Sequence, residues 1–145
     1  MKLLDVNVVL AGHRDDHPDF PSARPWLEAH LQGGEPFAIV EAVAWSFLRL
    51  ATNPRIFSVP TPVADAFAYL HALRSQPGHV ALGPGPQHLK LLERLCKEAD
   101  AYGDLVPDAA LAAIALEHAC ELVSFDRDFA RFEAIRWLRL EPGAR

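Results

Sequence analysis

The chain has 145 residues, of which half are hydrophobic and 23% are charged. This balance is typical of a folded globular protein and excludes a disordered one, and we expect a single domain over residues 1–145. The net charge is −5, which argues against a protein that binds nucleic acid through a broad basic face. No apolar run approaches the roughly 20 residues that span a bilayer, so we expect a cytoplasmic protein without a membrane segment.

Short apolar segments alternate with amphipathic segments along the chain. Taken in order, the apolar segments predict strands at residues 2–5, 37–40, 79–82, 121–125 and 137–140. Apolar residues spaced three and four apart predict helices at 21–32, 41–51, 62–75, 86–101 and 108–119. Strands that alternate with helices favour a parallel sheet covered on both faces. The predicted fold is therefore of the α/β class, a three-layer α/β/α sandwich with a mainly parallel sheet of about five strands.

Acidic residues follow three of the predicted strands. Asp5 ends the first strand, Glu41 follows the second, and Asp126 follows the fourth. A further acid, Asp108, lies at the start of the helix that leads into strand 121–125. In a parallel sheet, the carboxyl ends of the strands share an edge with the N-termini of the helices that lead into neighbouring strands. We therefore expect these four carboxylates to meet at one edge of the sheet.

Four carboxylates that meet would repel one another unless a cation compensated their charge. Ligand sets made only of oxygen atoms suit hard ions such as Mg²⁺ or Mn²⁺. We interpret the site as one for metal-assisted hydrolysis of phosphodiester bonds.

Each acid also has a simpler structural interpretation. Asp108 is a good helix cap, Asp126 could open a turn, and Glu41 could be favoured by the helix dipole. Asp5 is the hardest to explain in this way, because an ionisable group that follows a buried strand needs a partner. These separate interpretations do not predict that all four acids meet at one place.

Three segments resemble the PIN-domain family: Asp5-Val6-Asn7-Val8, the late helix at 108–115, and residues 122–129 with the sequence LVSFDRDF. The segment at 47–57, FLRLATNPRIF, further resembles the VapC toxins of type II toxin–antitoxin systems. This resemblance implies a metal-dependent endoribonuclease that cleaves RNA, often tRNA or rRNA. It also implies a VapB-type antitoxin as inhibitor and a homodimeric assembly.

The resemblance also implies roles for individual residues. Asp5, Asp108 and Asp126 would hold the Mg²⁺ or Mn²⁺ ion and its water, with Asn7 and Asp128 as auxiliary groups.

The chain departs from the family pattern at one position. The second acid of the PIN pattern falls where this chain has Ser46. Glu41 lies five residues earlier, about 140° around a helix, so it does not inherit that role automatically. Glu41 remains a candidate catalytic residue because the first turn of its helix lies close to the sheet edge.

Other functions remain open at this point. One is a catalytically silent PIN-like domain that binds a partner, which the departure at Ser46 allows. Another is a receiver-like phosphoacceptor module, but Lys90 and Lys97 fall in the middle of a predicted helix rather than near the acids. His13 and His17 have a spacing that would suit a metal on a helix, but Pro18 ends that segment, and we interpret it as a solvated loop.

Overall fold

The computed structural model describes residues 1–143. Its sheet contains the strands β1 (Lys2–Leu4), β2 (Phe37–Ala38), β3 (Glu121–Ser124) and β4 (Arg136–Arg139). The strands lie in the order β2-β1-β3-β4, and each neighbouring pair is parallel. This arrangement confirms the α/β class and the parallel sheet, and it makes β1 and β3 the central strands.

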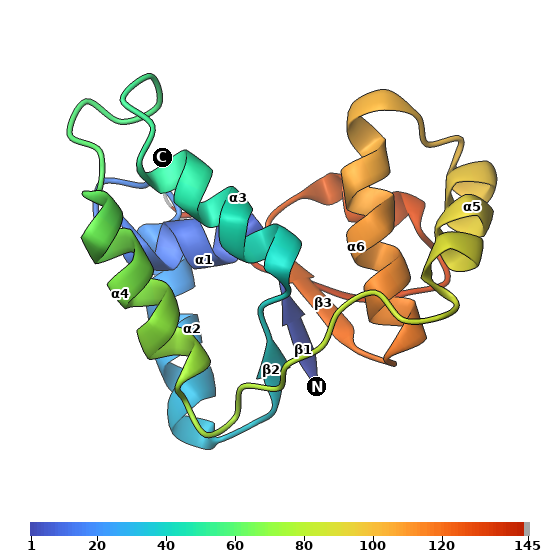
Figure 1. The fold of residues 1–145 in the computed structure, drawn as a ribbon, viewed down its shortest axis with the longest axis horizontal. Helices are drawn as coiled ribbons and strands as arrows, with labels where there is room; N and C mark the ends of the chain where they lie inside the picture. The colour runs from blue at the N-terminus through green and yellow to red at the C-terminus, as the bar shows by residue number, and fades with distance from the viewer. Residues whose placement is uncertain (144–145) are drawn as a thin grey trace.

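Six α-helices connect these strands within the described residues. They are α1 (Val6–His13), α2 (Phe20–Gly33), α3 (Glu41–Ala51), α4 (Val63–Arg74), α5 (His88–Ala99) and α6 (Val106–Glu117). Two short 3-10 helices, η1 (Gly103–Leu105) and η2 (Arg127–Arg131), precede α6 and follow β3. Figure 1 shows α1 to α4 gathered to the left of the strands and α5 and α6 to the right. The five predicted helices correspond to α2 to α6, and their ends agree within two residues.

The strand predicted at 79–82 is not formed, so the sheet has four named strands rather than about five. Instead, a single parallel bridge joins His79 to Phe37. The Val80 amide donates to the Phe37 carbonyl at 2.8 Å, and the Phe37 amide donates to the Gly78 carbonyl at 2.9 Å. Because β2 is only two residues long, it offers residues 79–82 too short an edge for a continuous ladder.

The helix α1 was not predicted from the sequence. Its first turns contain Val6, Val8 and Val9, and β-branched residues favour strands over helices. Tertiary packing overrides this preference, because Val8, Val9 and Leu10 are all buried where α1 packs against α2 and α3. The helix therefore starts directly after β1, and Asp5 lies at the junction of the two.

The hydrophobic core surrounds the two central strands. Leu3 and Leu4 of β1 and Leu122 and Val123 of β3 are fully buried. Adjacent residues of one strand point to opposite faces of a sheet, so both faces are covered, as the unbroken apolar runs predict. Within residues 1–143, no helix is long and apolar enough to cross a membrane.

Candidate metal centre

Asp5 lies at the point where β1 ends and α1 begins. One carboxylate oxygen accepts a hydrogen bond from the Val6 amide at 2.7 Å, which caps the first turn of α1. The other accepts from the Ser124 hydroxyl at 2.6 Å. Burial raises the pKa of Asp5, and so does the charge of Asp126, whereas the hydrogen bonds from Ser124 and Val6 lower it. Asp5 is thus a buried acid whose two oxygens are both held in place.

Ser124 links the ends of the two central strands. Its side chain is fully buried, and while its hydroxyl donates to Asp5 it accepts from Asn7 Nδ2 at 3.0 Å and from the Asp126 amide at 3.0 Å. Asn7 Oδ1 also accepts from the Phe125 amide at 3.3 Å. Ser124 is not among the site residues predicted from the sequence. The signal was present, because a hydroxyl that ends a buried apolar strand needs hydrogen-bond partners.

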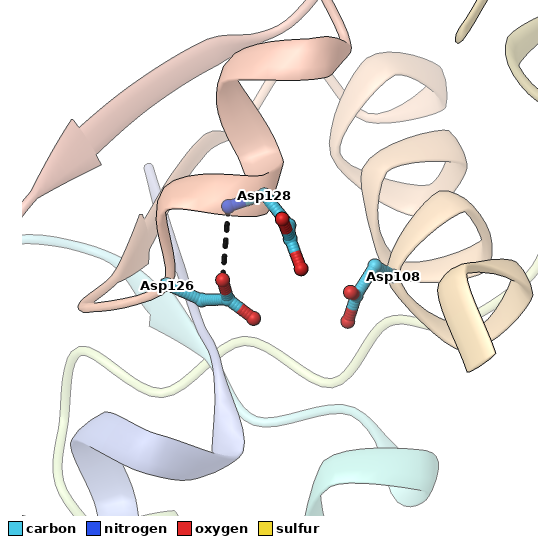
Figure 2. Close-up of side chains that lie close together, drawn as sticks. All are labelled: Asp108, Asp126 and Asp128. Carbon is cyan, nitrogen blue, oxygen red and sulfur yellow. Dashed lines mark hydrogen bonds between the residues drawn. The ribbon is translucent and has the colours of Figure 1, made fainter. Parts of the chain in front are cut away.

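Three further carboxylates, those of Asp108, Asp126 and Asp128, lie close together (Figure 2). Asp126 caps η2 and Asp128 lies in its first turn, and Asp126 Oδ1 accepts from the Asp128 amide at 2.9 Å. Asp108 comes from the first turn of α6. One ligand oxygen from each of the three acids lies within 4.8 Å of the others. We call these three residues the Asp108 cluster.

The Asp108 cluster concentrates negative charge with little compensation. Burial, together with the charges of Asp126, Asp5 and Asp128, raises the pKa of Asp108 to about 7. Among the ion pairs of residues 1–143, the cluster makes one, from Arg131 Nε to Asp128 Oδ1 at 3.9 Å, and both side chains are half exposed. A pair of that length and exposure neutralises little charge.

A hard divalent cation fits this group of residues. The donors are all carboxylate oxygens, they lie close enough to share one ion, and the cost of bringing them together calls for a positive charge. Asp108, Asp126 and Asp128 are the residues that would hold the ion. Asp5 lines the same cavity as Asp108 and contributes its charge, since it helps to raise the pKa of Asp108.

The structure brings most of the predicted site residues together. Asp128 lies with Asp108 and Asp126 in the Asp108 cluster, and Asp5, which accepts hydrogen bonds from Ser124 and Val6, is close enough for its charge to raise the pKa of Asp108. The capping interpretation fits Asp5 and Asp126, which both accept backbone hydrogen bonds. It does not fit Asp108, whose helix has Leu105 at its cap position and no capping side chain.

Glu41 lies apart from the other acids. Its carboxylate accepts a hydrogen bond from Arg74 Nη1 at 2.7 Å, and its side chain is 84% exposed. Arg74 also donates to the Ile39 carbonyl at 2.7 Å, which holds the guanidinium over the entrance to α3. As the first residue of α3, Glu41 points to this arginine and away from the sheet edge. The structure therefore corrects the prediction that all four acids meet, and it assigns Glu41 to an ion pair with α4.

A pocket of about 350 Å³ lies beside the acids, between α3 and α6. Asp5, Ser46 and Asp108 supply its polar groups. The remaining lining is apolar and consists of Val6, Ala42, Val43, Trp45, Pro107, Ala110, Leu111 and Ile114. We call this cavity the α3–α6 pocket. Ser46, which occupies the position of the missing family acid, thus reaches the same space as Asp5 and Asp108.

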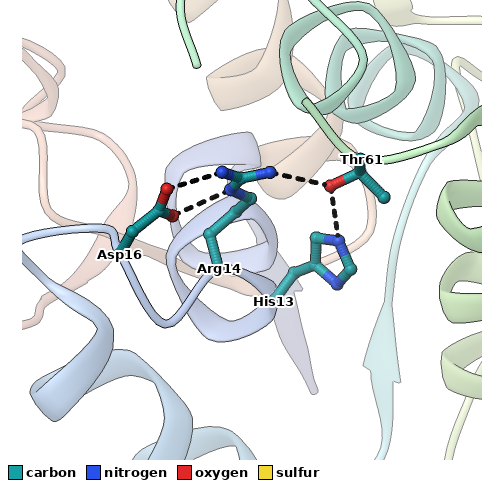
Figure 3. Close-up of polar contacts among 4 residues, drawn as sticks. All are labelled: His13, Arg14, Asp16 and Thr61. Atoms are coloured by element: carbon teal, nitrogen blue, oxygen red, sulfur yellow. Dashed lines mark hydrogen bonds and ion pairs between the residues drawn. The ribbon is translucent and has the colours of Figure 1, made fainter. Parts of the chain in front are cut away.

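A second polar cluster lies at the other end of α1 (Figure 3). It consists of His13, Arg14, Asp16 and Thr61, and we call it the Arg14 cluster. Arg14 donates to both carboxylate oxygens of Asp16 and, at 3.1 Å, to the hydroxyl of Thr61, which lies 3.0 Å from His13 Nε2. His13 ends α1 and packs against the rings of Tyr69 and Phe47. Burial and the nearby arginines lower the pKa of His13. The sequence predicted a solvated loop for His13, but the residue lies at the end of α1. There it contacts Thr61, which lies two residues before the start of α4.

Comparison with known proteins identifies the class to which this fold and site belong. The family model described as the PIN domain matches residues 2–135. The structure also superimposes on VapBC2 of Rickettsia felis bound to a promoter DNA fragment, with a TM-score of 0.71 and 17% identity over 97% of this chain and 98% of that chain. VapBC-1 of nontypeable Haemophilus influenzae gives a TM-score of 0.67 at 14% identity, over 95% of this chain and 96% of that one. At these identities, the superpositions support the fold alone.

Sequence relatives narrow the class further. Ribonuclease VapC25 of Mycobacterium tuberculosis is 56% identical over 139 residues, which cover 96% of this chain and 98% of that protein. VapC ribonuclease Mb2897 of Mycobacterium bovis is 38% identical over 94% of this chain and 93% of its own length. The chain therefore belongs to the PIN-domain family and, within it, to the VapC group.

Proposed function

We propose that this chain is a metal-dependent endoribonuclease and the toxin half of a VapBC-type toxin–antitoxin pair. The observation that carries the proposal is the Asp108 cluster, in which carboxylates from α6 and from the start of η2 converge, and the long, half-exposed ion pair from Arg131 to Asp128 offsets little of their charge. Relatives that share more than half of their residues with this chain are named ribonucleases. Since the substrate is RNA, we place the activity in the cytoplasm, with tRNA or rRNA as the target.

The position of each residue suggests its role in catalysis. A bound Mg²⁺ or Mn²⁺ ion would supply an activated water and neutralise charge that develops on the phosphate. Asp108, Asp126 and Asp128 would hold the ion, and the rigid backbone of β3 and η2 orients two of them. Ser124 and Asn7 tie the end of β1 to the end of β3, so that the carboxylate of Asp5 stays fixed near the Asp108 cluster. This support keeps the site in one geometry before substrate binds.

The partner would be an antitoxin with a basic segment. Structures that superimpose on this chain include complexes described as VapBC and as a toxin–antitoxin complex from Klebsiella pneumoniae. An arginine or lysine side chain placed at the Asp108 cluster would compensate its charge in the inhibited state. We expect that neutralising the basic residues of a co-purified antitoxin releases nuclease activity. Unchanged inhibition would mean that the antitoxin binds elsewhere.

The experiment that tests the nuclease activity is incubation of the purified chain with total cellular RNA, in Mg²⁺ or Mn²⁺ and in chelator. We expect cleavage that requires the metal and that is lost in Asp126→Asn. The matched control is Glu41→Gln, which neutralises a carboxylate outside the Asp108 cluster and should keep wild-type activity. Cleavage that survives the chelator would contradict the metal mechanism. No cleavage of any RNA in excess metal would favour a catalytically silent interaction domain.

A further inference from the structure

Trp45 is an exposed aromatic residue beside the candidate metal centre. It lies on α3, its side chain is 58% exposed, and it forms part of the wall of the α3–α6 pocket. Within the described residues, no other aromatic ring stacks on it, whereas His13, Phe47 and Tyr69 form ring contacts with one another nearby on α1, α3 and α4. A tryptophan left open to solvent at the mouth of a pocket is available to bind a flat partner.

The α6 side of the α3–α6 pocket is apolar. It is formed by Ala110, Leu111 and Ile114, and Leu111 and Ile114 are buried. Val43 of α3 also lines the pocket and is buried. The space between Trp45 and α6 therefore suits a planar, uncharged group.

The charges of the lining exclude a phosphate from this pocket. No lysine or arginine lines it, and its charged groups are the carboxylates of Asp5 and Asp108 at the end nearest the metal centre. A phosphate would meet like charge there, whereas a neutral nucleobase would not. Ser46 adds one hydroxyl, which can donate to or accept from the edge of a base.

We propose that the α3–α6 pocket binds an unpaired nucleobase next to the cleaved phosphate, stacked on Trp45 and contacted by the Ser46 hydroxyl. The inference rests on the proposed ribonuclease function and specifies its substrate class. A base can enter the pocket only after it leaves the stack of a helix, so the chain selects single-stranded loops rather than paired RNA. Stacking on an aromatic ring is tolerant of base identity, and Ser46 offers only one hydrogen-bonding group. Selection at this position is therefore mainly for an unpaired base.

Kinetic measurements on a short cleavable RNA test the proposal. First, the positions that flank the cut are replaced one at a time by an abasic nucleotide. We expect one position at which the loss of the base lowers kcat/KM by about tenfold to a hundredfold, the range for one base stacked on an aromatic residue. In Trp45→Ala, kcat/KM on the complete RNA should fall by a similar factor. In the same variant, removing the base at that position should lower kcat/KM only slightly further. Trp45→Phe, which keeps a ring, should recover most of the loss.

Controls separate this role from folding and from general RNA binding. Phe67 is an aromatic residue of α4 that is 45% exposed and does not line the pocket, so Phe67→Ala should keep wild-type kinetics. Thermal unfolding of each variant checks that Trp45→Ala folds, which its exposure favours. A second readout is tryptophan fluorescence during titration with a single-stranded oligodeoxynucleotide of the cleaved sequence. We expect quenching in the wild type that is absent in Trp45→Phe and is weak with the duplex form.

Several outcomes would overturn the inference. Unchanged kcat/KM in Trp45→Ala, or an abasic penalty as large in that variant as in the wild type, would show that no base stacks on Trp45. If Trp45→Ala weakened binding of the antitoxin and left RNA cleavage intact, the pocket would be a protein-docking groove. If the wild type cleaved no RNA, the proposed function would fail first, and fluorescence quenching by the oligonucleotide would then decide whether the pocket still binds a base.

Discussion

The two polar clusters of this protein lie at opposite ends of α1 and differ in their electrostatics. Opposite charges are paired in the Arg14 cluster, whereas like charges gather in the Asp108 cluster. In the second cluster, Arg14 is paired with Asp16, hydrogen-bonded to Thr61 and stacked 3.9 Å over the ring of Phe57. The hydrogen bond from Arg14 holds the pKa of Asp16 below its usual value. In the Asp108 cluster, carboxylates face one another, and the pKa of Asp108 rises to about 7.

This difference separates a structural cluster from a functional one. Satisfied charges lower the free energy of the folded chain by themselves, whereas gathered like charges raise it until a ligand arrives. The Asp108 cluster destabilises the metal-free fold, yet the buried hydrogen bonds of Ser124 hold the neighbouring acids in place at this sheet edge. Such an arrangement indicates a binding site. The predictions below test whether the two clusters really differ in this way.

The largest expected effect is on catalysis. Asp126→Asn keeps the shape of the side chain and an oxygen that can accept from the Asp128 amide, but it removes one charge from the Asp108 cluster. We expect kcat to fall by more than about a hundredfold, because loss of groups that only support metal ligands already costs 10- to 100-fold. Asp16→Asn makes the same change in the Arg14 cluster and should keep wild-type activity. Equal losses of kcat in the two variants, measured on one RNA substrate, would show that the two clusters do not differ in function.

The second effect is on stability with and without metal. An ion at about 100 times its dissociation constant stabilises the folded state by roughly 2.7 kcal/mol. Asp108→Asn should lose most of that increment, whereas Thr61→Val should retain it. Thermal unfolding in chelator and in saturating Mn²⁺ measures the increment for each variant. If Asp108→Asn kept the full metal-induced shift, Asp108 would not be a ligand.

The third effect lies in the Arg14 cluster. Thr61→Val preserves shape but removes the oxygen that accepts from Arg14 and lies beside His13. Leaving these partly buried groups unsatisfied should lower the free energy of unfolding by about 1–3 kcal/mol. The kcat of Thr61→Val should be unchanged, since the residue does not touch the site. Denaturant unfolding and RNA cleavage, measured on the same preparation, check both parts.

A fourth effect is a pH dependence of stability in the metal-free protein. The pKa of Asp108 is raised from 3.8 to about 7 on folding, so between these values the folded state binds more protons than the unfolded state. Stability therefore falls as pH rises through this window, and the charged carboxylate costs most above pH 7. The slope should be shallower in Asp108→Asn, in which Asp5, whose pKa is also raised, still contributes. Parallel slopes for variant and wild type, measured in chelator from pH 4 to 8, would mean that Asp108 ionises normally.

Local patterns in the sequence were sufficient for most elements of the fold. Apolar spacing predicts α2 to α6 and the four strands, because residues that bury one face of a helix or both faces of a strand must recur at fixed intervals. The position of Asp5, Asp108 and Asp126 at one sheet edge also followed, because the topology of parallel strands leaves few alternatives. The family resemblance led to the same class that the comparisons later gave.

Long-range contacts decided the remaining features. Helix α1 forms although its β-branched residues favour a strand, because the burial of its side chains against α2 and α3 outweighs this local preference. Residues 79–82 make only a bridge because the length of β2 limits their pairing.

The partners of the individual acids also depend on tertiary contacts. Glu41 accepts from Arg74, 33 positions away in the sequence, Asp5 accepts from Ser124, 119 positions away, and Asp128 lies with Asp108 and Asp126. Sequence spacing places a carboxylate at an edge of the sheet. Which partner its oxygens reach depends on side chains that only the folded chain brings near, since hydrogen bonds and ion pairs act over a few ångströms.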